Sequence, residues 1–309
     1  MTTRKLLLFL SAAAVALAAA PAAMAAFPGK NGLIAFQKSK GGALVKDLFV
    51  MNPNGSGQTD ITNTPKVSET DPSFAPDGRR LVFLWQTFDY KHAGIGVMKA
   101  NGTGMRRIVS GTPAEAFASP SWTADGKSIV YTRLQGTNPP THVYVVGASG
   151  GSQRQLSFGD EVQDFQPLAS PTGSRIVFYS YPPGSQGSEI MMNADGSAAA
   201  PIGGASAQDW SPDGNRFIFE RDHDIYASAL DGSGLTKLAA LPRVDETPVW
   251  SPDGKRFIFT SEGQHDIFVA NSDGSGLKNL THQPGFEHDA TWGVFAKNAG
   301  PHQKKHHKH

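Results

Sequence analysis

Acidic residues gather just ahead of one recurring position in this chain, and they are the first candidates for chemistry. Four of these acids, Glu69, Asp164, Asp245 and Glu287, stand five positions before a residue, usually aromatic, that recurs along the chain. Neighbouring acidic residues and one histidine complete the set. The candidates are Glu69, Asp71, Asp164, Asp245, Glu246, Glu287, His288 and Asp289. Neutral imidazole with carboxylates is a feasible ligand set for a divalent cation, and concentrated negative charge attracts a lysine- or arginine-bearing segment. The alternative is structural, because acids at strand beginnings can accept backbone N–H groups or hold water.

Two further motifs resemble chemical sites but stand in the wrong context. Residues 147–151 spell the Gly-x-Ser-x-Gly pattern of a nucleophile elbow, which works only on a strand-to-helix turn with Asp and His behind it. Here the pattern occupies a repeated turn between strands. Calcium loops need oxygen ligands at their first and last positions, and around Gly196 and Gly274 those positions hold apolar residues. We therefore expect neither a serine nucleophile nor a calcium loop.

The elements that must position the acidic residues are tandem repeats. A turn of the type Ser-Pro-Asp-Gly occurs at residues 75–78, 123–126, 170–173, 211–214 and 251–254. The residues just ahead of these turns, with a sixth copy that lacks the turn, are Phe74, Trp122, Ala169, Trp210, Trp250 and Trp292. Their spacings of 48, 47, 41, 40 and 42 residues match the ~40–50-residue period of four-stranded propeller blades. In each turn Pro presets φ and Gly supplies a positive φ, which suits a tight antiparallel connection.

Each turn leads into a β-branched and aromatic run, then a third strand, a second Gly turn and a short fourth strand. Such a meander has two apolar faces and buries them only by stacking on its neighbours. The first unit begins with a second-strand pattern at residues 32–36, and the last is a Trp strand alone at residues 290–295. Pairing the two removes an open edge. We predict an all-β fold, a six-bladed β-propeller of four-stranded antiparallel blades closed by pairing of its N- and C-terminal strands.

The repeat Pro-x-Trp-Ser-Pro-Asp-Gly-Lys/Arg, followed by Asp-Ile-Tyr/Phe and Asp-Gly-Ser, resembles the TolB-type propeller repeat. The resemblance covers residues 28–297. It implies a TolB-like propeller, although proteins like TolB carry a small α/β domain ahead of the propeller and these repeats directly follow an apolar N-terminal segment. The fourth repeat departs from the pattern, with Ala169 for Trp and Thr172 for Asp, and we expect looser packing there.

Composition limits the remaining functions. The formal charge is +1 and there is no cysteine, which argues against nucleic-acid binding and excludes disulfides and thiol chemistry. Residues 1–25 read as a signal peptide, with Arg4 and Lys5, an apolar run and the cleavage pattern Ala23-Met24-Ala25. The run is shorter than the ~20 residues that span a bilayer. We expect a secreted or periplasmic protein with a propeller at residues 28–297, a disordered tail at 298–309, and no membrane span after cleavage.

Inner strands should line an axial channel, with the acidic residues around its mouth. Loops of unequal length at residues 37–46, 85–93, 133–141 and 180–188 share that face and carry Trp85, Tyr90, Tyr179 and Tyr181. Variable loops on one face commonly mark a binding surface, although these aromatics could instead tuck back onto the blades. The tail histidines His302, His306, His307 and His309 are candidates for metal capture or mere solvation.

We therefore expect a monomeric, non-catalytic propeller that binds a protein or cell-envelope polymer through the variable loops and the acidic mouth. No cofactor is predicted, apart from the option of a divalent cation at the channel. The alternative is a metal-dependent propeller enzyme, of the lyase or lactonase type, with its site at the central channel.

Overall fold

The computed structural model describes residues 24–39, 45–135, 140–203, 207–240, 245–261, 265–282 and 286–296. Throughout these ranges the regular secondary structure is β. The strands are β1 (Met24–Ala25), β2 (Asn31–Ser39), β3 (Lys46–Met51), β4 (Thr59–Asp60), β5 (Val67–Phe74), β6 (Arg80–Thr87), β7 (Ala93–Lys99), β8 (Arg106–Ser110), β9 (Glu115–Trp122), β10 (Ser128–Gln135), β11 (Thr141–Gly147), β12 (Arg154–Gln155), β13 (Gln163–Ala169), β14 (Arg175–Tyr181), β15 (Ser188–Asn193), β16 (Ala200–Pro201), β17 (Asp209–Trp210), β18 (Arg216–Arg221), β19 (Asp224–Ala229), β20 (Thr236–Ala240), β21 (Asp245–Trp250), β22 (Arg256–Ser261), β23 (Asp266–Asn271), β24 (Lys278–Asn279) and β25 (Phe286–Val294).

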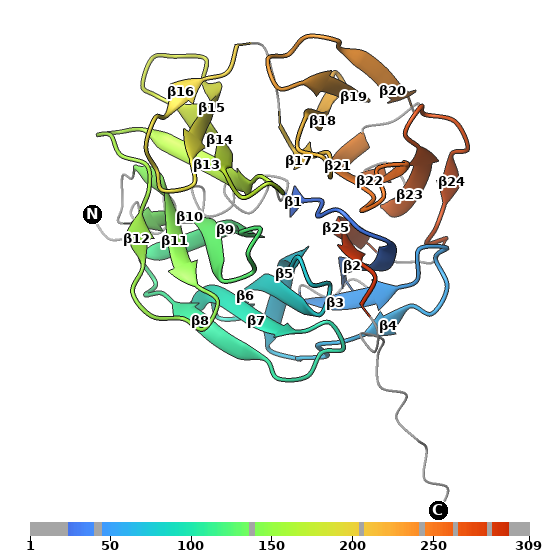
Figure 1. Ribbon diagram of the computed structural model, residues 1–309. Coiled ribbons are helices and arrows are strands. Elements are labelled where there is room, and N and C mark those ends of the chain that lie inside the picture. The colour runs from blue at the N-terminus through green and yellow to red at the C-terminus, as the bar shows by residue number, and fades with distance from the viewer. Residues whose placement is uncertain are drawn as a thin grey trace, which may run out of the picture.

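Strand pairing arranges these segments as four-stranded antiparallel units around a ring (Figure 1). Blade 1 is β25-β2-β3-β4, blade 2 is β5 to β8, blade 3 is β9 to β12, blade 4 is β13 to β16, blade 5 is β17 to β20 and blade 6 is β21 to β24. The predicted all-β propeller is confirmed. Blade 1 combines both ends of the chain, since β25 pairs with β2 with Trp292 opposite Ile34. A single parallel bridge between Thr141 and Gln163 also links blades 3 and 4.

The repeated turns form self-contained hairpins between the first and second strands. In blade 5 the Gly214 N–H donates to the Ser211 carbonyl at 2.8 Å. The Ser211 hydroxyl donates to Asp213 Oδ1 at 2.6 Å, and the same oxygen accepts the Asn215 N–H. The glycine has a φ of 73°, a left-handed conformation that glycine adopts without steric cost. The repeat is therefore explained by turn geometry.

The recurring tryptophans join one blade to the next. Trp122 is buried, and its indole N–H donates to the Ser73 carbonyl of blade 2 at 3.2 Å. The Arg80 guanidinium of blade 2 lies 4.6 Å from the Trp122 ring, and equivalent Arg–Trp stacks connect blade 5 to blade 6 and blade 6 to blade 1. Blade 4 has Ala169 at the tryptophan position, so the junction between blades 3 and 4 has no such stack.

The inner strands share a second feature, a β-bulge three residues before the recurring aromatic position. The register shifts there in blades 1, 2, 3, 4 and 6. The residues at the bulge all have a left-handed backbone: Asp71 (φ 49°), Ser119 (φ 49°), Gln166 (φ 55°), Thr247 (φ 50°) and Asp289 (φ 49°). A bulge re-aims a side chain, and the repetition brings equivalent side chains to one level of the ring.

The segment ahead of β2 lies at the centre of the ring (Figure 1). β1 pairs in parallel with β17, the innermost strand of blade 5, and the Gly29 N–H donates to the Pro252 carbonyl at 3.0 Å. Phe27 is 5% exposed and belongs to a buried cluster with residues of blades 2 to 5, among them Trp122 and Trp210. The axis, which we expected to be an open channel, is therefore occupied at this level by the chain's own N-terminal segment.

Residues 1–23, most of the predicted signal peptide, lie outside the described residues, as do the predicted tail at 298–309 and its histidines. None of the described residues forms a helix with the length and apolar character needed to span a bilayer.

Candidate binding surface

The two faces of the ring carry different connections. The turn face, as we call it, holds the Pro-Asp-Gly type turns and the Asp-Gly-Ser type turns. The connection face holds the loops between second and third strands and the links between blades. Antiparallel pairing places the beginning of each inner strand at the connection face, since Val67 at the beginning of β5 is opposite Thr87 at the end of β6.

Large aromatic side chains project from the connection face. Their exposed fractions are 54% for Phe88, 68% for Tyr90, 74% for Phe158, 45% for Tyr181 and 47% for Phe286. They stand on the β6–β7 loop, on the link between blades 3 and 4, at the end of β14 and at the beginning of β25. In the described part of the chain, the exposed large side chains of the turn face are Met105, Leu235 and Leu277 and a single aromatic, Phe295, which lies beyond β25. Exposed aromatics on one face are typical of an interaction surface.

The loop that carries Tyr90 is held by its own hydrogen bonds. The Tyr90 N–H donates to the Thr87 carbonyl at 2.9 Å, and the Thr87 hydroxyl donates to Asp89 Oδ1 at 2.7 Å. The His92 N–H donates to the Thr87 hydroxyl oxygen at 3.1 Å. Tyr90 has a left-handed φ of 58°. A loop fixed in this way presents its aromatic ring at a lower ordering cost on binding.

The four loop aromatics singled out from the sequence divide into two pairs. Tyr90 and Tyr181 are exposed, as a binding role requires. Trp85 is 3% exposed, with the Arg107 guanidinium 3.9 Å from its ring. The Tyr179 hydroxyl is engaged, because it donates to the Gln186 carbonyl at 2.8 Å. Trp85 and Tyr179 thus have structural contacts of their own, and Trp85 offers a partner almost no surface.

Three acids of the candidate set are buried within the blades. Glu69 accepts the Thr64 hydroxyl at 2.6 Å, and burial raises its pKa to about 7. Asp164 accepts the Ser157 hydroxyl at 2.5 Å and lies 3.5 Å from His142 Nδ1. Glu287 forms an ion pair with Lys38 at 2.5 Å, although burial still raises its pKa. All three carboxyls have protein partners, which accords with the structural alternative for these positions.

Asp71 and Asp289, two of the bulge residues, form the more open part of the acidic set. Gln37 lies between them: its Nε2 donates to Asp289 Oδ2 at 2.5 Å, and its Oε1 accepts the Asp71 N–H at 3.4 Å. Burial raises the pKa of Asp71, the negative charge of Asp289 raises it further, and the Lys46 charge opposes both. The two carboxyls, both partly exposed, therefore resist carrying two full negative charges together. We call Gln37, Lys46, Asp71, His288 and Asp289 the mouth cluster.

His288 belongs to this cluster as a neutral imidazole. Burial, the charge of Lys46 and the neighbouring His265 lower its pKa to about 4, and its ring centre lies 5.3 Å from that of His265. Within the described ranges, no group of three or more His, Cys, Asp or Glu side chains is arranged to hold a metal ion. The side chains of Asp245 and Glu246 lie outside the described residues, and a cation at the channel stays a prediction.

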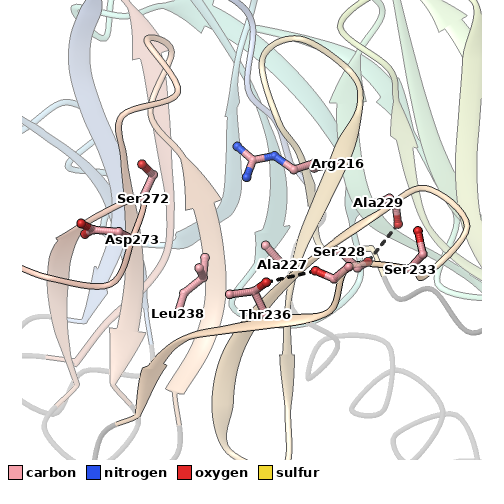
Figure 2. A pocket seen from close by; sticks show the side chains of 10 residues that line it. Arg216, Ala227, Ser228, Ala229, Ser233, Thr236, Leu238, Ser272 and Asp273 are labelled. Carbon is pink, nitrogen blue, oxygen red and sulfur yellow. Dashed lines mark hydrogen bonds between the residues drawn. The ribbon is translucent and has the colours of Figure 1, made fainter.

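A hollow of about 380 Å³ lies on the turn face between blades 5 and 6. Figure 2 shows Arg216 between a wall that includes Ser228 and Thr236 and an opposite side formed by Ser272 and Asp273. Its two charged groups are already engaged. Arg216 stacks 4.9 Å from the Trp250 ring, and Asp273 accepts the Ser275 hydroxyl at 2.7 Å. The hollow therefore contains no acid–base pair poised for catalysis.

Sequence reasoning missed several residues of this surface. Phe158 and Phe286 follow no repeat pattern, so exposure alone reveals them. Among the bulge residues, the sequence singled out Asp71 and Asp289 but missed Ser119, Gln166 and Thr247. All five share one offset from the recurring aromatic position, a signal that their dissimilar side chains conceal. Gln37 gave no signal, because its role depends on β2 lying beside β25.

Together, the ring of stacked blades and the pairing of β25 with β2 define a β-propeller. The chain belongs to the TolB β-propeller family: the PD40 family model, described as the TolB beta propeller domain, matches residues 15–205. A curated relative, the protein TolB homolog of Chlorobium luteolum, is 32% identical over 111 residues, which are 34% of this chain and 25% of that protein. The match thus spans well under two thirds of the relative's length.

Solved structures share the fold. TolB from Acinetobacter baumannii superposes with a TM-score of 0.69 at 16% identity, covering 85% of this chain and 67% of that one. An oligogalacturonate lyase from Vibrio parahaemolyticus gives a TM-score of 0.53 at 13% identity, covering 73% of this chain and 72% of that one. At such identities the likeness concerns the fold alone, since one fold serves many functions.

Proposed function

We propose that this chain is an exported, non-catalytic propeller that binds a protein or cell-envelope polymer through its connection face. The observation that carries the proposal is the set of five exposed aromatic side chains on that face, over blades 1 to 4. Aromatic side chains supply large contact areas at low entropy cost and dominate many binding surfaces.

The mouth cluster adds charge to the proposed surface. Its paired carboxyls, Asp71 and Asp289, would accept a lysine or arginine of the partner, whose positive charge favours ionisation of both. Since the pKa of Asp71 is raised in the free protein, such binding would release a proton. Affinity should therefore increase as the pH rises towards the pKa of free Asp71, and Asp71→Asn should remove that dependence.

Export is part of the proposal and rests on the first 25 residues. Their short positive segment, apolar run and Ala-x-Ala pattern are typical of a cleaved signal peptide. Membership of the TolB propeller family accords with a location in the bacterial envelope.

The binding surface is tested by capture from solubilised bacterial envelopes and by co-sedimentation with isolated cell-wall polymer. The triple variant Tyr90→Ser, Phe158→Ser, Tyr181→Ser should lose about tenfold or more in affinity, equivalent to roughly 1.4 kcal/mol. The matched control is Met105→Ser, Leu235→Ser, Leu277→Ser on the turn face, which should bind as the unaltered chain does. Equal loss in both variants, or in neither, would contradict the proposal.

The alternative, a metal-dependent enzyme, differs in its metal content. Protein purified without an affinity tag and ending at residue 296 would carry one tightly held divalent ion if the channel were a metal site. Elemental analysis after washing with chelator decides the matter: we expect no stoichiometric metal, and one ion per chain would favour the enzyme.

A further inference from the structure

The N-terminal segment brings Ala26 against a buried carboxyl at the axis. Ala26 is 0% exposed, and its backbone N–H donates to Asp209 Oδ1 at 2.9 Å. The other carboxyl oxygen, Oδ2, accepts the Trp250 N–H at 2.7 Å. Asp209 thus ties the N-terminal segment to blades 5 and 6 through both of its oxygens.

Asp209 is itself 0% exposed, and among the described residues no Lys, Arg or His pairs with it. Burial raises its pKa well above the ordinary value, although hydrogen bonds from the backbones of Trp250, Ala26 and Trp210 oppose that shift. A buried carboxylate without a counter-ion is strongly unfavourable. A positive charge at the position of the Ala26 nitrogen would therefore stabilise the ionised form of Asp209.

Signal-peptide cleavage would create that charge. The pattern Ala23-Met24-Ala25 directs a signal peptidase to the bond between Ala25 and Ala26. Hydrolysis adds one water across this bond: Ala25 leaves with a carboxylate, and the Ala26 nitrogen becomes an amine that takes up a proton near neutral pH, because α-amino groups titrate at about 8.

We propose that the mature chain begins at Ala26 and that its α-ammonium is the buried counter-ion of Asp209, which locks the processed N-terminus into the axis of the ring. This rests on the export part of the proposed function and not on the binding surface. Ala26 and Phe27 are already buried, and Gly29 is bonded to blade 6. Cleavage gives up the short pairing of β1 with β17, and at the Ala26 nitrogen it replaces one N–H donor by an ammonium.

The pair has a defined pH signature. An ion-paired α-ammonium has a raised pKa in the folded state, so its stabilisation is present below about pH 8 and is lost as the pH rises through the folded pKa. On the acid side the stabilisation disappears once Asp209 is protonated. A chain with one extra residue before Ala26 has an amide at this atom, and so lacks the stabilisation at any pH.

The first measurement is the intact mass of the exported chain, which should correspond to a first residue of Ala26. A mature chain that begins at Ala23 or at Phe27 would overturn the proposal. The remaining measurements use a chain released from an N-terminal fusion so that it begins at Ala26 with no extra residue, and a matched chain that begins Gly-Ala26.

The second measurement is the rate at which acetic anhydride modifies the α-amino group of the folded chain. We expect modification about tenfold slower than in the Gly-Ala26 chain, corresponding to a pKa raised by about one unit, with the Asp209→Asn variant restoring the faster rate. An α-amino group modified equally fast in both chains would overturn the proposal.

The third measurement compares thermal unfolding of the two chains at several pH values. The chain beginning at Ala26 should unfold at the higher temperature near pH 7, and the difference should disappear near pH 10. A difference that persists unchanged at pH 10 would mean that the extra glycine acts by steric clash, and the ion pair would be rejected. None of these outcomes depends on the partner, so a failed binding experiment leaves them intact. A chain exported without cleavage would instead contradict the export part of the proposed function.

Discussion

Carboxyl groups on the turn face and at the connection face have opposite pKa shifts. On the turn face, Asp125, Asp213 and Asp273 accept a neighbouring hydroxyl, from Thr123, Ser211 and Ser275 respectively, and their pKa values are lowered. At the connection-face ends of the blades, burial raises the pKa values of Glu69, Glu189 and Glu287. These three acids of the turn face thus serve local turn geometry, while Glu69, Glu189 and Glu287 are held in the interior by tertiary contacts. Asp89, on an exposed connection-face loop, behaves like the turn-face acids, since the Thr87 hydroxyl lowers its pKa.

The difference separates stability from recognition. Turn-face hairpins are complete within a few residues, so each repeat can reproduce them. Loops of the connection face are unequal and carry the exposed aromatics, so they can change without disturbing the hairpins. We therefore expect substitutions on the turn face to act on folding and substitutions of the exposed aromatics to act on binding.

The largest effect tests the ring that supports both faces. Ending the chain before Ala290 removes most of β25, so β2 loses the strand that pairs with it and the buried Trp292 is lost. An open inner edge invites aggregation. We expect aggregation or loss of cooperative unfolding, measured by size-exclusion chromatography and calorimetry. A chain ending at residue 296 is the control, and identical unfolding of the two would refute the terminal closure.

The next effect concerns the junctions between blades. Trp122→Ala should cost about 3–5 kcal/mol of unfolding free energy, as is usual for a buried aromatic, measured by denaturant unfolding. Arg80→Gln removes the stacked guanidinium together with its ion pair to Asp77 and its hydrogen bond to the Gly126 carbonyl, and should cost about 1–2 kcal/mol. If the tryptophan variant lost no more than the arginine variant, the tryptophans would not be the main link between blades.

A pair of glycines in blade 2 sharpens the account of the turn face. Gly78 has a φ of 62°, and a Cβ there would lie 2.1 Å from the Val294 carbonyl oxygen, whereas Gly104 has a φ of 68° and open space around it. Gly104→Ala should therefore cost only the backbone strain of about 1–2 kcal/mol. Gly78→Ala should cost clearly more, because the backbone of blade 1 must also shift. If Gly78→Ala and Gly104→Ala had equal midpoints of unfolding in urea, the packing of the Gly78 turn against blade 1 would be unimportant.

The opposite pKa shifts predict a stability maximum at mildly acidic pH. A carboxyl whose pKa is lower in the folded state stabilises the fold at pH values above its unfolded pKa. This stabilisation is lost as the pH falls through the folded pKa, which applies to the turn-face aspartates. A raised pKa means that the folded state binds the proton more tightly, so stability decreases as pH rises from the unfolded value through the folded one. For Glu69 and Glu189 that window runs from 4.5 to about 7.

Thermal unfolding between about pH 4 and pH 8 measures this directly. The unfolding temperature should decrease as the pH rises above the value of maximal stability. Glu69→Gln should make that decrease shallower. A decline that is unchanged in Glu69→Gln would assign it to other groups.

The smallest effect on stability is expected for an exposed aromatic of the β6–β7 hairpin, in contrast to a buried aromatic of the same hairpin. Tyr90→Ala should change the unfolding free energy by no more than about 0.5 kcal/mol, as is usual at exposed positions. Trp85→Ala, on the same β6–β7 hairpin, should cost about 3–5 kcal/mol because its ring is buried. Comparable stability losses in the two variants would mean that Tyr90 is packed against the protein, and would weaken its assignment to the binding surface.

The sequence was sufficient for the architecture because the signals are local and repeated. Turn residues at a fixed period, apolar runs behind them and an unpaired strand pattern at each end predict the blades and the pairing of residues 32–36 with residues 290–295. The sequence also identifies the exceptional fourth repeat, since Ala169 occupies the position at which a tryptophan stack would otherwise join two blades.

Only the tertiary structure decided which side chains are available and which are covered. Trp85 lies beneath Arg107 of β8, and Phe158 is exposed on a link between blades, although both are aromatic residues of variable segments. The position of Ala26 against Asp209 is a contact between residues 183 positions apart. Local pattern specifies strands and turns, but burial and charge pairing depend on which distant segments meet, and ring closure determines that.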